Sequence, residues 1–224
     1  DALIKAVESG RLPTSRIDEA NARVFDLNAR FAVSGVVQPD LVWSSDHLEI
    51  SQRAARAGTA LLGDSGVLPL PDATEKIALV EFAPHTDSLA LDAVGSGPLA
   101  GVFGTKLPHV ETVVLSATQP ATDQLERARQ LAAEARVLVV ATRNAHLSAE
   151  QQRSAGELLA AANQSVLLCL RNPYDAEVLP DADAVLCTFG DSAPSLRAAV
   201  EALNGPQEFL AEWRKVFQQR RDMV

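Results

Sequence analysis

The sequence predicts an α/β fold: a three-layer αβα sandwich around a mostly parallel sheet of about five or six strands, preceded by a helical stub. Short runs rich in Val and Leu recur through the second part of the chain. Their nearly continuous apolar character is typical of strands buried on both faces. Helical patterns separate these runs, and strands that alternate with helices build parallel sheets with right-handed crossovers.

The predicted strands and helices alternate within residues 76–205. The strands are Ile77–Phe82, Thr112–Ala117, Val137–Thr142, Val166–Leu170 and Ala184–Phe189. The helices are Leu125–Ala135, Ala149–Ala162 and Ala193–Leu203, and the segment from Ser88 to Lys106 is helical in part. This order is that of a flavodoxin-like, doubly wound sheet.

The residues before the predicted sheet are mainly helical. Leu3, Ile4 and Val7 share one helical face, and a second apolar stripe runs from Ile17 to Phe31. A third helix is predicted from about Asp46 through Leu61 and Leu62 to the turn at 63–66. The predicted organisation is therefore a helical stub (1–34), a linker with a connecting helix (35–75), the sandwich (76–205) and a C-terminal helix (206–224). The apolar stripe of that last helix consists of Phe209, Leu210, Trp213 and Phe217.

Composition excludes several classes of function. The net charge of −9 argues against a nucleic-acid partner, because phosphate binding needs a basic surface. No apolar run approaches the roughly 18 residues of a membrane span. The chain opens inside a helical pattern, so we expect it to be part of a longer protein, with any targeting signal upstream and the compartment left open. Cys169 and Cys187 lie in predicted strands and are interpreted as buried thiols, with a disulfide between neighbouring strands as the alternative.

Motifs for cofactors and metals are weak. The stretch Gly95-Ser96-Gly97-Pro98-Leu99-Ala100 matches a dinucleotide fingerprint, but it lies too far from the preceding strand for a tight strand-to-helix turn. Pro98 is better explained as the start of a helical turn. The four histidines are scattered and are interpreted as surface or capping residues. We therefore predict no bound cofactor and no metal.

Two polar segments follow predicted strands at the edge where open α/β sheets bind ligands. The first is Thr142-Arg143-Asn144-Ala145-His146, and the second is Arg171-Asn172-Pro173-Tyr174-Asp175. Arginine offers a fork suited to carboxylates or paired hydroxyls, and asparagine pairs with amides or hydroxyls. These segments are candidates for a substrate-binding site or a domain interface. A structural alternative is that Arg171 pairs with Asp175 and that Asn172 caps the next turn. The candidate residues are Arg143, Asn144, Arg171, Asn172, Tyr174 and Asp175.

The stretch Leu170-Arg171-Asn172-Pro173-Tyr174-Asp175 resembles the C-terminal domain of family 3 glycoside hydrolases, in the β-N-acetylglucosaminidase branch. The Thr142–Ala145 segment, followed by a helix bearing Gln151, is similar to the same branch. The segment from His47 to Leu70 resembles the connection between that family's two domains, and Gly10–Val24 resembles the last helices of its (β/α)8 barrel. The tail beyond Asn204 departs from the family pattern.

The resemblance implies a retaining glycosidase that acts on β-linked N-acetylglucosamine, as in cell-wall fragments. In such enzymes one carboxylate attacks the anomeric carbon while a second group protonates the leaving oxygen. The family's nucleophile and this branch's His–Asp acid/base lie on the barrel, which this sequence lacks, so the chain alone is expected to be inactive. Other branches carry a Glu acid/base in this domain, for which Glu81 and Glu177 are the nearest residues.

The expected partners are thus a carbohydrate bound through the longer enzyme and the missing barrel. The uncovered apolar stripes of the stub also favour self-association. One alternative is a free-standing module that binds a sugar or a protein at the same sheet edge. A flavodoxin-like nucleotide binder is a third reading, with little support.

Overall fold

The computed structural model describes residues 1–31, 44–84 and 98–205. The chain divides into two units, Asp1–Ser44 and Ser45–Val224. The linker before residue 44, the residues Gly95–Gly97 of the dinucleotide-like stretch and the predicted tail helix lie outside the described residues. Within the described ranges, no helix is both long and apolar enough to cross a membrane.

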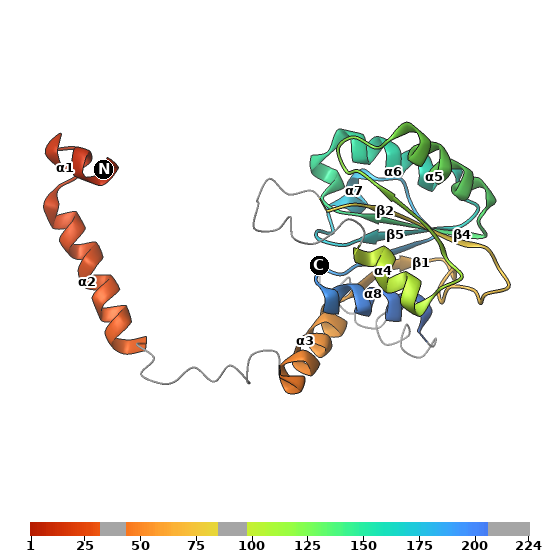
Figure 1. The fold of residues 1–224 in the computed structure, drawn as a ribbon, viewed down its shortest axis with the longest axis horizontal. Helices are drawn as coiled ribbons and strands as arrows, with labels where there is room; N and C mark the ends of the chain where they lie inside the picture. Colours follow the sequence, from red (N-terminus) through yellow and green to blue (C-terminus); the bar gives the residue numbers. More distant parts are fainter. Residues whose placement is uncertain (32–43, 85–97, 206–224) are drawn as a thin grey trace. The chain divides into compact units, whose positions relative to one another are not determined.

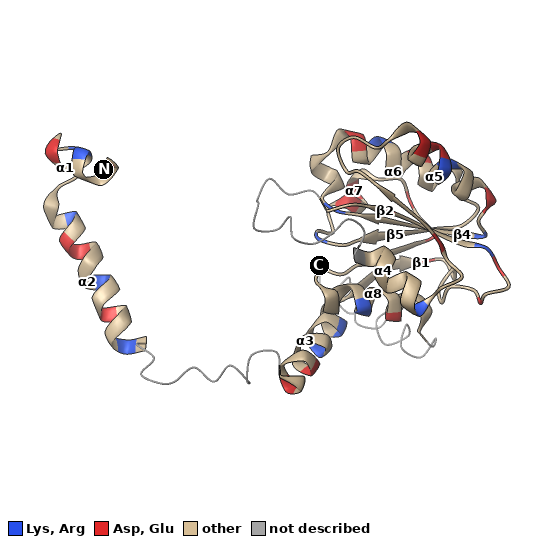
Figure 2. Cartoon of the chain, viewed as in Figure 1, with Lys and Arg blue, Asp and Glu red and all other residues tan. Residues whose placement is uncertain are grey.

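The first unit contains two helices, α1 (Ala2–Glu8) and α2 (Thr14–Phe31). Both are as the apolar spacing predicts. The chain turns between them at Gly10, whose φ of +69° is a conformation that glycine adopts without steric cost. Helix α2 buries none of its residues, and charged groups of both signs follow one another along it (Figure 2).

The second unit is an open six-stranded sheet between two layers of helices (Figure 1). The strands are β1 (Ala60–Asp64), β2 (Ile77–Phe82), β3 (Glu111–Leu115), β4 (Val137–Thr142), β5 (Ser165–Cys169) and β6 (Ala184–Cys187). Their order is β1-β6-β5-β4-β2-β3, with β1 antiparallel to β6 and every other pair parallel. Strands β2 to β6 alone have the flavodoxin-like order, so the predicted fold class is confirmed.

The helices of the second unit are α3 (Ser45–Gly58), α4 (Pro98–Lys106), α5 (Thr122–Glu134), α6 (Ala149–Ala161), α7 (Asp175–Val178) and α8 (Ala193–Asn204), with a 3₁₀ turn η2 at Ala145–Leu147. Helices α5 and α6 cover one face of the sheet, and α4 and α8 cover the other (Figure 1). Helix α4 begins at Pro98, as predicted.

Alternate residues of each central strand enter two separate cores, as the strand period requires. In β4, Val137, Val139 and Ala141 pack with α4 and α8, whereas Leu138 and Val140 pack with α5 and α6. All six residues of β4 and of β2 are buried. The sequence pattern of continuous apolar strands thus reflects burial on both faces.

One prediction about the connecting segment is wrong. Leu61 and Leu62 do not continue the third helix, which ends at Gly58; they belong to strand β1. The sheet therefore begins within residues 35–75, which the sequence assigned to a linker and connecting helix. Asp64 ends this strand, and its Oδ1 accepts from the backbone N–H groups of Gly66, Val67 and Leu68, which closes the turn.

Candidate functional site

The candidate residues lie at the carboxyl edge of the parallel strands. Strand order reverses between β2 and β4, and ligands of doubly wound sheets bind outside the carboxyl ends of strands at such a switch point. Arg143 follows β4 directly, and Arg171 follows β5 after one further residue. The topology therefore brings the two predicted polar segments to one edge.

Arg143 is fully engaged inside the protein at the switch point. Its Nη2 donates to Glu81 Oε1 at 2.7 Å, its Nη1 donates to the Phe82 carbonyl, and its Nε donates to Asp191 Oδ2 at 3.1 Å. Only 1% of its side chain is exposed. Gln151 bonds both its backbone N–H and its carbonyl. Arg143 is therefore a structural residue rather than a ligand contact.

Glu81 joins this arrangement from inside strand β2, where it is completely buried. Besides the Arg143 guanidinium, its carboxylate accepts from the backbone N–H groups of Leu99 at 3.2 Å and Ala100 at 2.8 Å. These are first-turn donors of α4, which lack helical partners and attract a negative charge. Glu81 thus couples the switch point to the start of α4.

Asp191 links the two candidate arginines. Its Oδ2 accepts from Arg143 Nε and also from Arg171 Nε, at 2.9 Å. The alternative pairing of Arg171 with Asp175 is wrong, because Asp175 is engaged elsewhere. Arg171 is about one quarter exposed, and no residue in the described ranges bonds its Nη1 or Nη2. The outer half of its donor fork is therefore available for a ligand.

Asp175 is completely buried and is surrounded by donors. Thr142 Oγ1 donates to Oδ2 at 2.7 Å, and the His146 backbone N–H donates to Oδ1 at 3.0 Å. The ring nitrogen Nδ1 of His146 lies 2.8 Å from the same Oδ1. Asp175 therefore orients its neighbours instead of meeting a ligand itself.

Asn144 and Asn172 contact each other, and Tyr174 lies beside them on the second segment. Asn172 Nδ2 donates to Asn144 Oδ1. Asn144 has a φ of 55°, in the left-handed region where asparagine is enriched, and precedes η2. Helix α7 has no side-chain cap, so the interpretation of Asn172 as a cap is wrong. Tyr174 is exposed, and its ring meets that of His146 edge-on, with 5.4 Å between centroids.

Of the six predicted residues, Arg171, Asn172, Asn144 and Tyr174 are exposed or partly exposed, whereas Arg143 and Asp175 are buried. Sequence reasoning missed the roles of Glu81, Asp191 and His146. A charge inside an apolar strand, as at Glu81, is a signal for a buried partner. Asp191 gives no such signal, because it lies in the loop after β6, which ends at Cys187, and its partners Arg143 and Arg171 come from other loops.

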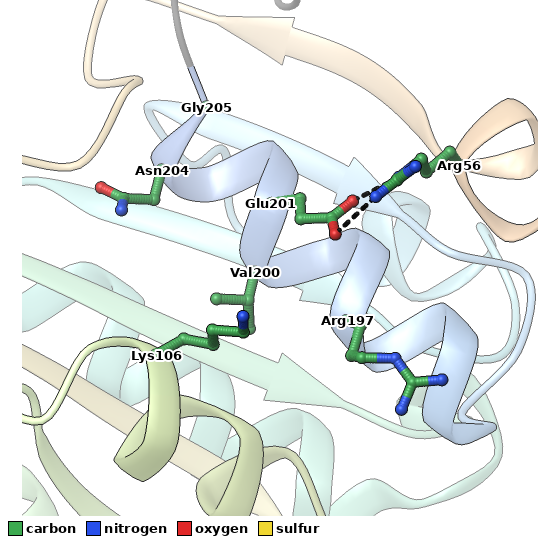
Figure 3. Close-up of a pocket in the computed structure, with 7 residues that line it drawn as sticks. All are labelled: Arg56, Lys106, Arg197, Val200, Glu201, Asn204 and Gly205. Carbon is green, nitrogen blue, oxygen red and sulfur yellow. Dashed lines mark hydrogen bonds and ion pairs between the residues drawn. The ribbon is translucent and has the colours of Figure 1, made fainter. Parts of the chain in front are cut away.

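A cavity of about 380 Å³ shares no residue with this edge (Figure 3). It lies between α3, α4 and α8, and its lining includes Arg56, Lys106, Arg197 and Glu201. Arg56 and Lys106 occupy the last turns of α3 and α4, where a cation offsets the negative end of the helix dipole. Within the described residues, no group of three His, Cys, Asp or Glu could hold a metal ion.

Neither the family models nor the curated proteins match this chain. Solved structures do. A family 3 β-N-acetylglucosaminidase from Paenibacillus sp. strain FPU-7 is 24% identical with a TM-score of 0.73, over 92% of this chain and 40% of that one. A fungal multi-domain β-N-acetylglucosaminidase of family 3 is 22% identical with a TM-score of 0.69, over 91% and 23%. A β-glucosidase from Listeria innocua is 18% identical with a TM-score of 0.61, over 91% and 32%.

The chain thus spans less than half the length of these enzymes. The resemblance expected from the sequence is confirmed at the level of fold. This chain has the fold of a part of the family 3 glycosidases.

Proposed function

We propose that this chain is the non-catalytic C-terminal domain of a retaining family 3 glycosidase acting on β-linked N-acetylglucosamine, with the last barrel helices attached. Its sheet edge supports the active site of a barrel outside the chain. The choice of N-acetylglucosamine rests on the Arg171–Asp175 stretch and on the two β-N-acetylglucosaminidases of similar fold.

The observation that carries the non-catalytic role is that three carboxylates at the edge are already engaged. Glu81 is held by Arg143 and α4, Asp175 by Thr142 and His146, and Asp191 by two arginines. A retaining glycosidase uses two carboxyl groups that flank the scissile bond. Glu81, one of the two nearest equivalents of an acid/base in other branches, is buried in an ion pair and is unsuited to protonate a leaving group.

Exposed apolar side chains on the same loops support contact with another part of a larger protein. Leu147, Tyr174 and Phe189 are 77%, 53% and 55% exposed. Exposed apolar side chains beside polar groups are typical of an interaction site. The same surface also favours the second candidate, a module that binds a sugar or a protein by itself.

The first test is hydrolysis of an aryl β-N-acetylglucosaminide by the chain alone and by a longer enzyme that contains it. Activity confined to the longer enzyme supports the proposal. Activity of the chain alone would overturn the non-catalytic role.

The second test is Arg171→Ala in the longer enzyme, with Arg129→Ala as the matched control. Arg129 is similarly paired, to Glu157 at 2.7 Å, but on the surface of α5 and α6. We expect only Arg171→Ala to change KM or kcat. If KM, kcat and stability are all unchanged, the edge has no role in the enzyme.

A further inference from the structure

We propose that His146 is a ligand contact of this edge: its ring is fixed through Nδ1 by Asp175, and its Nε2 accepts a hydrogen bond from a saccharide hydroxyl. The proposal rests on the proposed function, since it takes a sugar as the ligand. It adds a residue that neither the sequence motifs nor the comparisons assign.

The orientation of the ring follows from the surroundings of Asp175. Both carboxylate oxygens already accept from other donors, Oδ2 from Thr142 and Oδ1 from the His146 backbone. An oxygen in that position is an acceptor for Nδ1 as well, so the Nδ1 atom carries the proton. In a neutral imidazole, the other nitrogen then carries the lone pair. Asp175 therefore selects the tautomer in which Nε2 is an acceptor.

The surroundings of Nε2 favour a ligand. No residue in the described ranges bonds this atom. In those ranges, the one side-chain nitrogen that is both buried and without a partner is Nε2 of His109, so the unbonded Nε2 of His146 is not a buried atom. Nε2 of His146 is therefore accessible to solvent. The His146 side chain is 18% exposed, so its body is packed while this atom remains reachable.

The neighbours of His146 suit a saccharide. Tyr174 presents an exposed ring, which can pack against the apolar face of a sugar. Asn172 Nδ2 donates to Asn144 Oδ1, and no residue in the described ranges bonds Asn144 Nδ2 or Asn172 Oδ1, so both atoms are open to a ligand. With the outer nitrogens of Arg171, the edge offers donors, the Asn172 acceptor and one aromatic surface, and Nε2 adds a second acceptor. Binding sites of this kind combine an apolar contact with a few placed polar groups.

The alternative is that His146 has only a structural role, in which its ring donates to the buried carboxylate of Asp175 and binds no ligand. His146→Asn separates the two roles, because the asparagine amide can replace Nδ1–H as the donor to Asp175 but has no group at the place of Nε2. We expect this variant to keep its stability and to bind N-acetylglucosamine about five-fold more weakly, the effect of one lost hydrogen bond. His47→Asn in α3 is the matched control, and its affinity should be that of the unsubstituted chain.

The measurement is a titration of the full chain, labelled with ¹⁵N-histidine, with N-acetylglucosamine. We expect the Nε2 resonance of His146 to shift during the titration, while that of His47 stays in place. If the amides of Arg171 and Asn172 respond to the sugar but Nε2 of His146 does not shift, the ligand role of His146 is overturned and the proposed function is not. The same holds if His146→Asn binds the sugar as tightly as the unsubstituted chain. If no resonance at this edge shifts, both the ligand role of His146 and any sugar contact of the edge are overturned. The hydrolysis assay tests separately whether the chain is part of a glycosidase.

Discussion

Nη2 of Arg143 lies 2.7 Å from Oε1 of Glu81, and both side chains are buried almost completely. This ion pair joins the loop after β4 to strand β2 at the point where the strand order reverses. Glu81 in turn caps α4, and Arg143 holds Asp191, which contacts Arg171. The pair therefore positions the outer residues of the edge without facing a ligand.

Replacing Arg143 by Met should destabilise the chain strongly. Removal of one partner leaves the Glu81 charge buried without compensation, which costs about 3–5 kcal/mol. Urea unfolding of the chain measures this loss. The control is Arg153→Met on the surface of α6, where Arg153 pairs with Glu150 and Glu157; we expect a loss below about 1 kcal/mol there. Similar losses for the two variants would contradict the structural role of Arg143.

The sheet was predictable because the physical signal is local. Strands buried on both faces are apolar throughout, and β2 and β4 coincide with the predicted ranges residue for residue. Strand β1 gave no such signal. Leu61 and Leu62 continue the helical spacing of α3, and only the antiparallel pairing with β6, more than 120 residues away, holds them in a strand.

The candidate site was predictable in part for the same reason. Polar residues directly after a strand, such as Arg143 and Arg171, could be placed at one edge from topology alone. Their partners could not, because Arg143 pairs with Asp191 across 48 positions of sequence and with Glu81 across 62. No rule of sequence spacing predicts contacts between residues so far apart. For the same reason the sequence suggested the nearby Asp175 as a partner of Arg171, which is wrong.

The ion pair between Arg56 and Glu201 predicts a dependence of stability on pH. Arg56 Nε lies 2.6 Å from Glu201 Oε2 and joins α3 to α8 (Figure 3). The hydrogen bond and charge of Arg56 hold the pKa of Glu201 below its ordinary value. A carboxyl whose pKa is depressed by folding stabilises the fold above its unfolded pKa of about 4.3, and this contribution is lost as the pH falls through the folded value.

Glu201→Gln should therefore lower the free energy of unfolding at neutral pH by less than about 1 kcal/mol, since both side chains are more than one third exposed. The difference from the unsubstituted chain should close as the pH is lowered below about 4. Urea unfolding at neutral and acid pH tests both points. Glu126→Gln is the control, because Glu126 is exposed on α5 and has no ion-pair partner in the described ranges; a difference that grows on acidification would refute the sign.

The apolar stripe of α2 predicts self-association of the chain. Val24, Leu27 and Phe31 lie on one helical face and are all exposed in their unit. We expect sedimentation velocity to detect dimers or larger species at high protein concentration. Leu27→Glu should shift the chain toward monomer, whereas Ala29→Glu, on the opposite side of the helix, should not. A chain that sediments as a monomer at every concentration would count against this surface.

We predict that the two cysteine thiols do not react with thiol reagents in the folded state. Cys169 and Cys187 are in register on the neighbouring strands β5 and β6, and both are free and buried. A hydrogen bond with Cys187, together with burial, raises the pKa of the Cys169 thiol above its ordinary value, so the reactive thiolate is scarce at neutral pH. Ellman's reagent should therefore modify neither residue in the native chain and both in urea.

Gln119→Cys, at an exposed position, supplies a thiol that should react at once under native conditions. Rapid labelling of the native unsubstituted chain would mean that β5 and β6 separate readily. The sheet next to Asp175 would then be too mobile to hold the His146 ring in one orientation.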